Sequence, residues 1–356
     1  MLLDRYLLSR FLGIFLNVSF VSVLLVSLYA LLDFLVGFKE KRTDVALSYF
    51  LNILPLGFYY ISFITLSISL ILFLRKVFEK KMELTVQSFG ISPLRFSLPV
   101  LLFSVFLSST FLLGNEYAFP KLLGNLWFIE KNYKKKQEVK GFIKNFWFIK
   151  KENEVKTYYH VGNLNLSDGS LFNFYTMKVE RKNLNPLEVL KVFSGVWKDK
   201  EIFIRSGEIY DFEKGKREKV FNKTFKLGLS IKEVELFSEK IDFLSLSEIF
   251  FLMQKSKKVG LNVDVYTGEL FYRVMFSLSP VFISIFSLYL FFKHKVLSQV
   301  IPRFLVFIVI LWLVILSPKI LPQKANQPVL YSLIPIFLLI LYSLKGVYDL
   351  RKGFRV

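Results

Sequence analysis

Stretches without a charged residue recur along the chain and are separated by polar segments. A helix needs roughly 20 apolar residues to cross a hydrocarbon core of about 30 Å, and most of the stretches have or approach that length. The run 304–318 is shorter, but Ile301 and Pro302 extend it if Arg303 reaches the interface with its charged end. The six stretches are 11–32, 45–74, 96–115, 274–292, 304–318 and 325–344. We therefore predict six membrane-spanning helices, which excludes a soluble globular enzyme.

A different pattern fills the chain between the third and fourth predicted spans. From about 138 to 234, runs with period two recur, as in half-buried strands; the segment 155–161 is one example. Turn signals such as Ser167-Asp168-Gly169 separate these runs. The spacing predicts an antiparallel sheet of the sandwich or jelly-roll kind. Ser245 and Glu248 then fit a capping box, which predicts a helix that leads toward the fourth span.

The predicted fold class is membrane α plus β: six transmembrane helices in two sets of three, with an inserted antiparallel β domain of jelly-roll-like form. Residues 1–115 hold the first three spans and a short cytoplasmic helix near 77–90. Residues 116–240 form the β domain and 241–270 the connecting helix. The last three spans occupy 271–356.

Basic residues indicate how the spans are oriented. The chain has 48 Lys and Arg against 28 Asp and Glu, a formal net charge of +20. Short loops rich in Lys and Arg stay in the cytoplasm. The four polar segments on the side of the termini hold 14 Lys and Arg against 4 Asp and Glu, whereas the two short ones opposite hold 5 against 3. We expect both termini in the cytoplasm and the β domain in the periplasm, on an inner-membrane protein.

The sequence lacks the residues that several kinds of chemistry need. It has no cysteine and only two histidines, His160 and His294, which excludes disulfides, thiolate sites and histidine-rich metal sites. It has no G-x-x-x-x-G-K-[ST], G-x-S-x-G or H-E-x-x-H motif. No charged residue lies inside the six apolar stretches, which argues against an ion-coupled carrier. We expect no cofactor, no metal and no catalytic residue on this chain.

Four short motifs carry a resemblance to a known family. Glu83-Leu84, followed after five residues by Gly90-Ile91-Ser92, looks like the E-L-x-x-x-x-x-G-[IV]-S segment of the lipopolysaccharide export permeases, the LptF/LptG (YjgP/YjgQ) family. The other three are Leu3-Asp4-Arg5-Tyr6, Asn115-Glu116-Tyr117-Ala118-Phe119-Pro120, and Ser245-Leu246-Ser247-Glu248 with Gly260. Their order and spacing cover nearly the whole chain. The proline-rich entry to the last span has Pro322 and Pro328 without the family's tryptophan, which leaves the choice between LptF and LptG open.

The resemblance implies a non-enzymatic permease subunit of an ABC exporter. In that family two permeases pair, so the partner here is a paralogous or identical chain. A separate cytoplasmic ATPase dimer, LptB-like, uses the ATP. Lipopolysaccharide enters sideways from the membrane and passes through the jelly-roll domains to a periplasmic bridge of LptC and LptA type. The basic charge comes with no nucleic-acid module, so no nucleic-acid partner is expected.

The same resemblance indicates which residues couple the permease to its ATPase. The residues that it implies are Glu83, Leu84, Ser88 and Gly90, on the short helix that leads to the third span. A carboxylate at position 83 can bond to donors of the ATPase. The alternative is a solvated helix face, on which Glu79 and Glu83 pair with nearby lysines.

Three cations after the first span are candidates for binding the phosphates of lipid A. They are Lys39, Lys41 and Arg42, on the outward side of the membrane. The alternative is an ordinary interfacial loop, balanced by acidic neighbours such as Asp44.

Two other classes of function remain open. A polytopic envelope enzyme acting on lipid-linked glycans needs an acid/base pair at the membrane surface, for which Asp33 and Glu116 are the candidates. A mechanical scaffold only transmits the motion of an ATPase to the periplasm.

Overall fold

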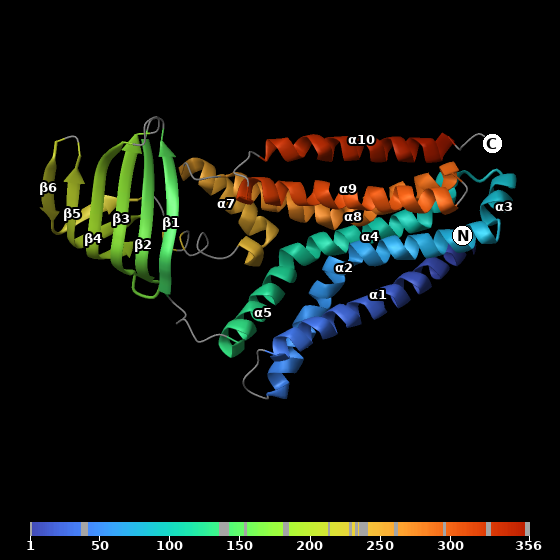
Figure 1. Ribbon diagram of the computed structural model, residues 1–356, viewed down its shortest axis with the longest axis horizontal. Helices are drawn as coiled ribbons and strands as arrows, with labels where there is room; N and C mark the ends of the chain where they lie inside the picture. Colours follow the sequence, from blue (N-terminus) through green and yellow to red (C-terminus); the bar gives the residue numbers. More distant parts are fainter. Residues whose placement is uncertain are drawn as a thin grey trace. The chain divides into compact units, whose positions relative to one another are not determined.

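The chain folds into two units, one of helices and one built around a sheet (Figure 1). The helical unit comprises Met1–Lys136 and Gly268–Val356, and the other unit is Gln137–Thr267. The computed structural model describes residues 2–36, 42–134, 142–152, 155–180, 185–212, 214–227, 230–231, 234, 241–259, 263–294, 297–324 and 329–352.

Six helices of the first unit are long and apolar enough to cross a membrane, as predicted: α1, α2, α4, α8, α9 and α10. Two shorter ones, α3 and α5, flank α4 in the sequence. The bounds are α1 Leu2–Val36, α2 Thr43–Glu79, α3 Met82–Ser88, α4 Pro93–Tyr117, α5 Phe119–Lys134, α8 Asp264–His294, α9 Leu297–Lys324 and α10 Leu330–Lys352.

The six long helices differ in how much of their surface they bury. The most apolar part of α8 is 72% buried, whereas that of α1 or α10 is only 22% buried. Large apolar side chains such as Phe20 and Phe337 stay exposed, as expected for surfaces that face lipid. Helix α8 is therefore a central helix of the unit, and α1 and α10 lie at its periphery.

The segment before the sheet is helical, which corrects the sequence boundary at residue 116. Helix α5 packs on the membrane unit through Leu126 and Ile129, which are buried. The Tyr49 hydroxyl on α2 donates a hydrogen bond of 3.0 Å to the Glu130 carboxylate. The apolar positions of α5 recur three residues apart, a helical spacing. The sheet starts only at Phe142.

The second unit contains a seven-stranded antiparallel sheet, so the predicted jelly-roll-like β domain is confirmed. Neighbours in sequence pair from β1 to β6, and β7 pairs with β5. Strands β6 and β7 lie end to end along β5 in one register, interrupted only at Phe221 and Asn222. The bounds are β1 Phe142–Glu152, β2 Val155–Asn165, β3 Ser170–Glu180, β4 Pro186–Lys198, β5 Glu201–Asp211, β6 Lys216–Val220 and β7 Lys223–Lys226.

The core of this unit consists of side chains that alternate along the strands. Val161, Phe174, Val192 and Ile202 are completely buried, one each on β2, β3, β4 and β5. The predicted alternation therefore describes a sheet with an apolar face. The runs with period two were predicted to extend to about 234, but the last strand, β7, ends at Lys226, and Ile231 is helical.

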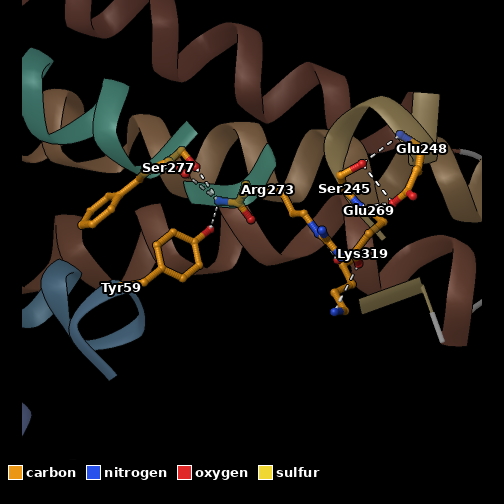
Figure 2. A network of polar contacts seen from close by, with 9 residues as sticks. Tyr59, Ser245, Glu248, Glu269, Arg273, Ser277 and Lys319 are labelled. Carbon is orange, nitrogen blue, oxygen red and sulfur yellow. Dashed lines mark hydrogen bonds and ion pairs between the residues drawn. The ribbon is translucent and has the colours of Figure 1, made fainter. Parts of the chain in front are cut away.

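The predicted capping box starts helix α7 (Leu246–Val259). The Ser245 backbone N–H donates to Glu248 Oε2 at 2.7 Å, and the Glu248 backbone N–H donates to Ser245 Oγ at 3.2 Å (Figure 2). These reciprocal bonds satisfy two backbone donors at the start of the helix.

The turn between β2 and β3 depends on Gly169. This residue has φ +72°, and its carbonyl accepts a 2.8 Å hydrogen bond from the Trp197 backbone N–H. A Cβ at position 169 would lie 2.3 Å from the Trp197 carbonyl oxygen. We expect Gly169→Ala to lower the free energy of unfolding by about 2 kcal/mol or more, because left-handed strain alone costs about 1–2 kcal/mol. Denaturant unfolding of the full chain, followed by tryptophan fluorescence, measures the change.

Gly215→Ala is the matched control for this prediction. Gly215 also has a positive φ, +61°, but a Cβ there would meet nothing within 4 Å. The Gly215→Ala variant should lose only the cost of a left-handed backbone at a residue with a Cβ, about 1 kcal/mol of the free energy of unfolding. Equal losses in the two variants would show that the contact with Trp197 does not matter.

Candidate functional site

Helix α3 is set off from its neighbours by two left-handed positions. Lys81, just before the helix, has φ 51°, and Gly90, just after it, has φ 74°. The Gly90 backbone N–H donates to the Gln87 carbonyl, and Ile91 donates to Val86, which closes the last turn of the helix. Ser92 then caps α4 by accepting a hydrogen bond of 3.3 Å from the Arg95 backbone N–H. The chain therefore turns sharply on both sides of α3.

The four residues that the sequence assigned to ATPase coupling all lie on α3 or on the turn after it. Leu84 and Ser88 are exposed and four residues apart, so they share a face of the helix. The side chain of Glu83 lies outside the described part of the structure. Val86, on another face, is only 8% exposed and joins the core of the helical unit. Helix α3 therefore packs against the helical unit on one face, through Val86, and exposes another face that carries Leu84 and Ser88.

Phe89 belongs to the exposed surface of α3 and was missed in the sequence. Its ring is 78% exposed at the C-cap of the helix. Together with Leu84, it gives this short helix two exposed apolar side chains beside Ser88. The turn made by Gly90, which can be inferred from the sequence, was the only local signal of where Phe89 would point.

The three candidate phosphate ligands are only partly described. Lys39 and Lys41 lie outside the described residues. Arg42 precedes α2, and its guanidinium forms an ion pair of 2.7 Å with the Asp44 carboxylate. The guanidinium also lies 5.9 Å from the ring centre of Tyr133 on α5. About half of the Arg42 side chain, 53%, remains exposed.

A buried group of charged residues lies on the fourth long helix, before its predicted charge-free stretch 274–292. Helix α8 starts at Asp264 rather than near 274 and carries Glu269 and Arg273, whose side chains are 1% and 6% exposed. Glu269 Oε1 accepts a hydrogen bond of 2.9 Å from Arg273 Nε. Glu269 Oε2 forms an ion pair with Lys319 Nζ on α9 at 3.2 Å (Figure 2). Glu269, Arg273 and Lys319 form what we call the ion triad.

The backbones of α8 and α9 approach closely beside the ion triad. A Cβ at Gly268 would lie 2.1 Å from the Pro318 carbonyl oxygen, so only glycine permits this contact. Lys319 follows Pro318, and the approach brings its amine to Glu269. Lys319 also lies 5.1 Å from the ring centre of Tyr272. The four-residue spacing of Glu269 and Arg273 was the local signal in the sequence, whereas Lys319 is distant along the chain.

An uncharged network joins three of the long helices. The Asn115 side-chain amide on α4 donates to the Tyr59 hydroxyl on α2 at 3.0 Å and to Ser277 Oγ on α8 at 3.1 Å. Both acceptors, Tyr59 and Ser277, are labelled in Figure 2. The Ser104 and Ser284 hydroxyls form a second hydrogen bond between α4 and α8. Asn115 opens the N-E-x-x-x-P motif, so this motif has a structural role at the meeting point of α2, α4 and α8.

The β unit has an open apolar cavity of about 480 Å³, whose wall includes the exposed ring of Trp147. Aromatic and aliphatic side chains from β1 to β4 line it, among them Trp147, Tyr158, Tyr175, Met177 and Val189. The His160 ring lies 4.3 Å from the Trp147 ring and 5.7 Å from the Tyr175 ring, between ring centres. The cavity is therefore walled by side chains suited to an apolar ligand.

The part of the chain that the structure describes contains no cluster of side chains that could hold a metal ion. There, no three His, Asp or Glu side chains gather as a metal would require. Asp33 lies exposed in the last turn of α1, and Glu116 lies half-buried in the last turn of α4.

Six helices of membrane-spanning length with an inserted β domain are the architecture of a multi-pass membrane protein. A family model described as lipopolysaccharide export system permease LptF/LptG matches residues 5–348. The chain therefore belongs to the LptF/LptG family, a family of transport permeases, and the resemblance seen in the sequence is confirmed.

Proposed function

We propose that this chain is the permease subunit of an ABC transporter that extracts lipopolysaccharide from the inner membrane and passes it to a periplasmic bridge. The observation that carries the proposal is the apolar cavity of about 480 Å³ in the β domain, in a chain of the LptF/LptG family. Acyl chains need such an apolar environment once they leave the bilayer, because each exposed methylene costs about 0.8 kcal/mol.

The proposed orientation puts both termini and α3 in the cytoplasm and the β domain in the periplasm. The excess of Lys and Arg in the short segments on the side of the termini supports it. Helix α3 lies at the same end of the helical unit as the start of α1 and the end of α10 (Figure 1), which supports the assignment of all three to one side of the membrane.

Energy in this proposal comes from a separate ATPase dimer of LptB type that docks on α3 and binds the ATP. The exposed Leu84, Ser88 and Phe89 give it a surface to contact, and Glu83 adds a carboxylate in the first turn. A paralogous or identical permease completes the transporter, and a bridge of LptC and LptA type receives the lipid. Arg42, with Lys39 and Lys41, contacts lipid phosphates on the opposite side of the membrane, where its half-exposed guanidinium can accept an anion.

A photoreactive residue at Tyr158 tests the proposal, because Tyr158 lines the cavity. In proteoliposomes that hold the complete transporter and lipopolysaccharide, we expect a lipid adduct at position 158 that depends on ATP. The control position is Phe221, which is 59% exposed on the same unit and does not line the cavity. A scaffold that carries no lipid would give no adduct at position 158 while ATP is still hydrolysed, and that result would refute the proposal.

A further inference from the structure

A groove of about 690 Å³ lies between α1 and α4. Its length is apolar: Leu8 and Leu12 contribute from α1, and Leu98, Leu102 and Phe106 from α4. Both helices are candidate membrane spans, so the groove lies along the membrane part of the helical unit. It is separate from the β-domain cavity and from the ion triad.

One end of the groove is charged. Arg95, in the first turn of α4, forms an ion pair of 2.9 Å with Asp4 on α1, and its side chain remains 52% exposed. Arg5 lines the same end. A guanidinium has five N–H donors, so the pairing with Asp4 leaves Arg95 able to bind a further anion. Two arginines against one carboxylate give this end a net positive charge.

The dimensions of the groove match one leaflet of a bilayer. Arg95 and Phe106 are eleven positions apart on α4, which corresponds to about 16 Å at 1.5 Å per residue. Half of a hydrocarbon core of about 30 Å is about 15 Å. A headgroup held at Arg95 would therefore have its acyl chains alongside the leucines and Phe106 down to the middle of the membrane.

The chemistry of the groove favours a lipid over a protein helix as the occupant. A helix with side chains is about 10 Å wide. Acyl chains are thinner and flexible, and the charged end complements a phosphate headgroup.

We propose that the groove between α1 and α4 binds one anionic glycerophospholipid, with its phosphate at Arg5 and Arg95 and its acyl chains along Leu8, Leu98 and Leu102. The leaflet that borders α3 supplies the lipid. In the orientation of the proposed function this is the cytoplasmic leaflet. No other part of the inference rests on the proposed function. Only four residues separate the end of α3 from the start of α4. A lipid bound here therefore contacts the helix that follows directly on the proposed ATPase contact.

The experiment uses the full chain, in the complex with which it purifies, in nanodiscs of phosphatidylcholine. The probe is a small fraction of phosphatidylglycerol with a photoreactive acyl chain, and mass spectrometry maps its adducts. We expect adducts concentrated in peptides that contain Leu8 or Leu98, and few when the same photoreactive chain is carried by phosphatidylcholine. Removal of one arginine, in Arg5→Gln or Arg95→Gln, should lower adduct yield about fivefold, the factor for one cation at an anionic lipid.

Two further variants separate the groove from general effects. Arg351→Gln removes an exposed cation near the end of α10 and should leave the adducts unchanged. Leu102→Trp narrows the groove without a change of charge and should remove the adducts although both arginines remain. Adducts spread evenly over all exposed helix faces, or equal yields from both probes, would each overturn the proposal. Phospholipid is not the cargo of the proposed exporter. The outcome of the lipopolysaccharide crosslinking at Tyr158 is therefore independent of the outcome of the groove experiment.

Discussion

Glu269→Ala is expected to destabilise the helical unit by about 3–5 kcal/mol, the usual effect of removing one partner from a buried ion pair. The substitution removes the carboxylate that contacts both Arg273 and Lys319. The Arg273 side chain is only 6% exposed and would retain its charge in a poorly solvated place. Thermal unfolding of the purified chain in detergent measures the loss, and we expect reduced recovery of folded protein from membranes as well.

Glu79→Ala provides the comparison for this variant. Glu79 also pairs with an arginine four residues away, Arg75, at 2.6 Å, but both side chains are more than half exposed. An exposed pair of this kind contributes about 0.3–0.5 kcal/mol. In addition, Glu269→Met combined with Arg273→Met should recover much of the stability, because it removes both nearly fully buried charges and leaves only Lys319, whose side chain is 28% exposed, without this carboxylate. Similar melting temperatures for Glu79→Ala and Glu269→Ala would contradict a structural role of the ion triad.

Glu83→Ala is expected to weaken the docking of the ATPase by roughly tenfold or more, because a hydrogen bond to a charged group contributes about 1.5–3 kcal/mol. Position 83 lies in the first turn of α3, the helix that we propose to contact the ATPase. The measurement is ATP hydrolysis stimulated by lipopolysaccharide in proteoliposomes, over a series of ATPase concentrations. The folded permease should be recovered in normal amounts, since α3 is held by Val86 and by the turns on either side.

The same Glu79→Ala variant serves as control here, because Glu79 lies at the end of α2, four residues before Glu83. The transporter assembled with Glu79→Ala should hydrolyse ATP at the same rate as the transporter with the unaltered permease. If Glu83→Ala couples normally at every ATPase concentration, Glu83 has no part in coupling and the interpretation of a solvated helix face is correct. The two variants thus separate a specific contact from a general loss of negative charge near α3.

The spans, the strands and the capping box could be predicted because each is determined by residues close together in the sequence. Charge-free runs identify helices in a membrane whatever their neighbours are, and the alternation in 155–161 marks the strand β2. Ser245 and Glu248 are three residues apart and need no distant partner. Helix α5 was missed because an amphipathic helix next to a β domain lacks a long apolar run, so a boundary drawn at the end of such a run excludes it.

The ion triad shows why part of the site could not be predicted. A charge-free run ends where a charge begins, so the fourth span was started after Arg273 rather than before Glu269. The charges of Glu269 and Arg273 are tolerated there because they pair with each other and because Lys319 of α9 forms a second ion pair with Glu269. That pairing depends on the approach of Gly268 to Pro318, which brings together residues that are far apart in the sequence. The orientation of Phe89 likewise follows from the left-handed turn at Gly90 and from the packing of Val86.

Helix α4 is bonded to three other helices. It contacts α1 through Asp4 and Arg95, α2 through Tyr59 and Asn115, and α8 through the hydroxyl of Ser277. It also follows directly on α3. A displacement of α4 along its own axis would have to be shared by α1, α2 and α8, or break these bonds one after another. A force applied to α4 through α3 should therefore displace α1, α2, α4 and α8 together as one rigid body, and not one helix at a time.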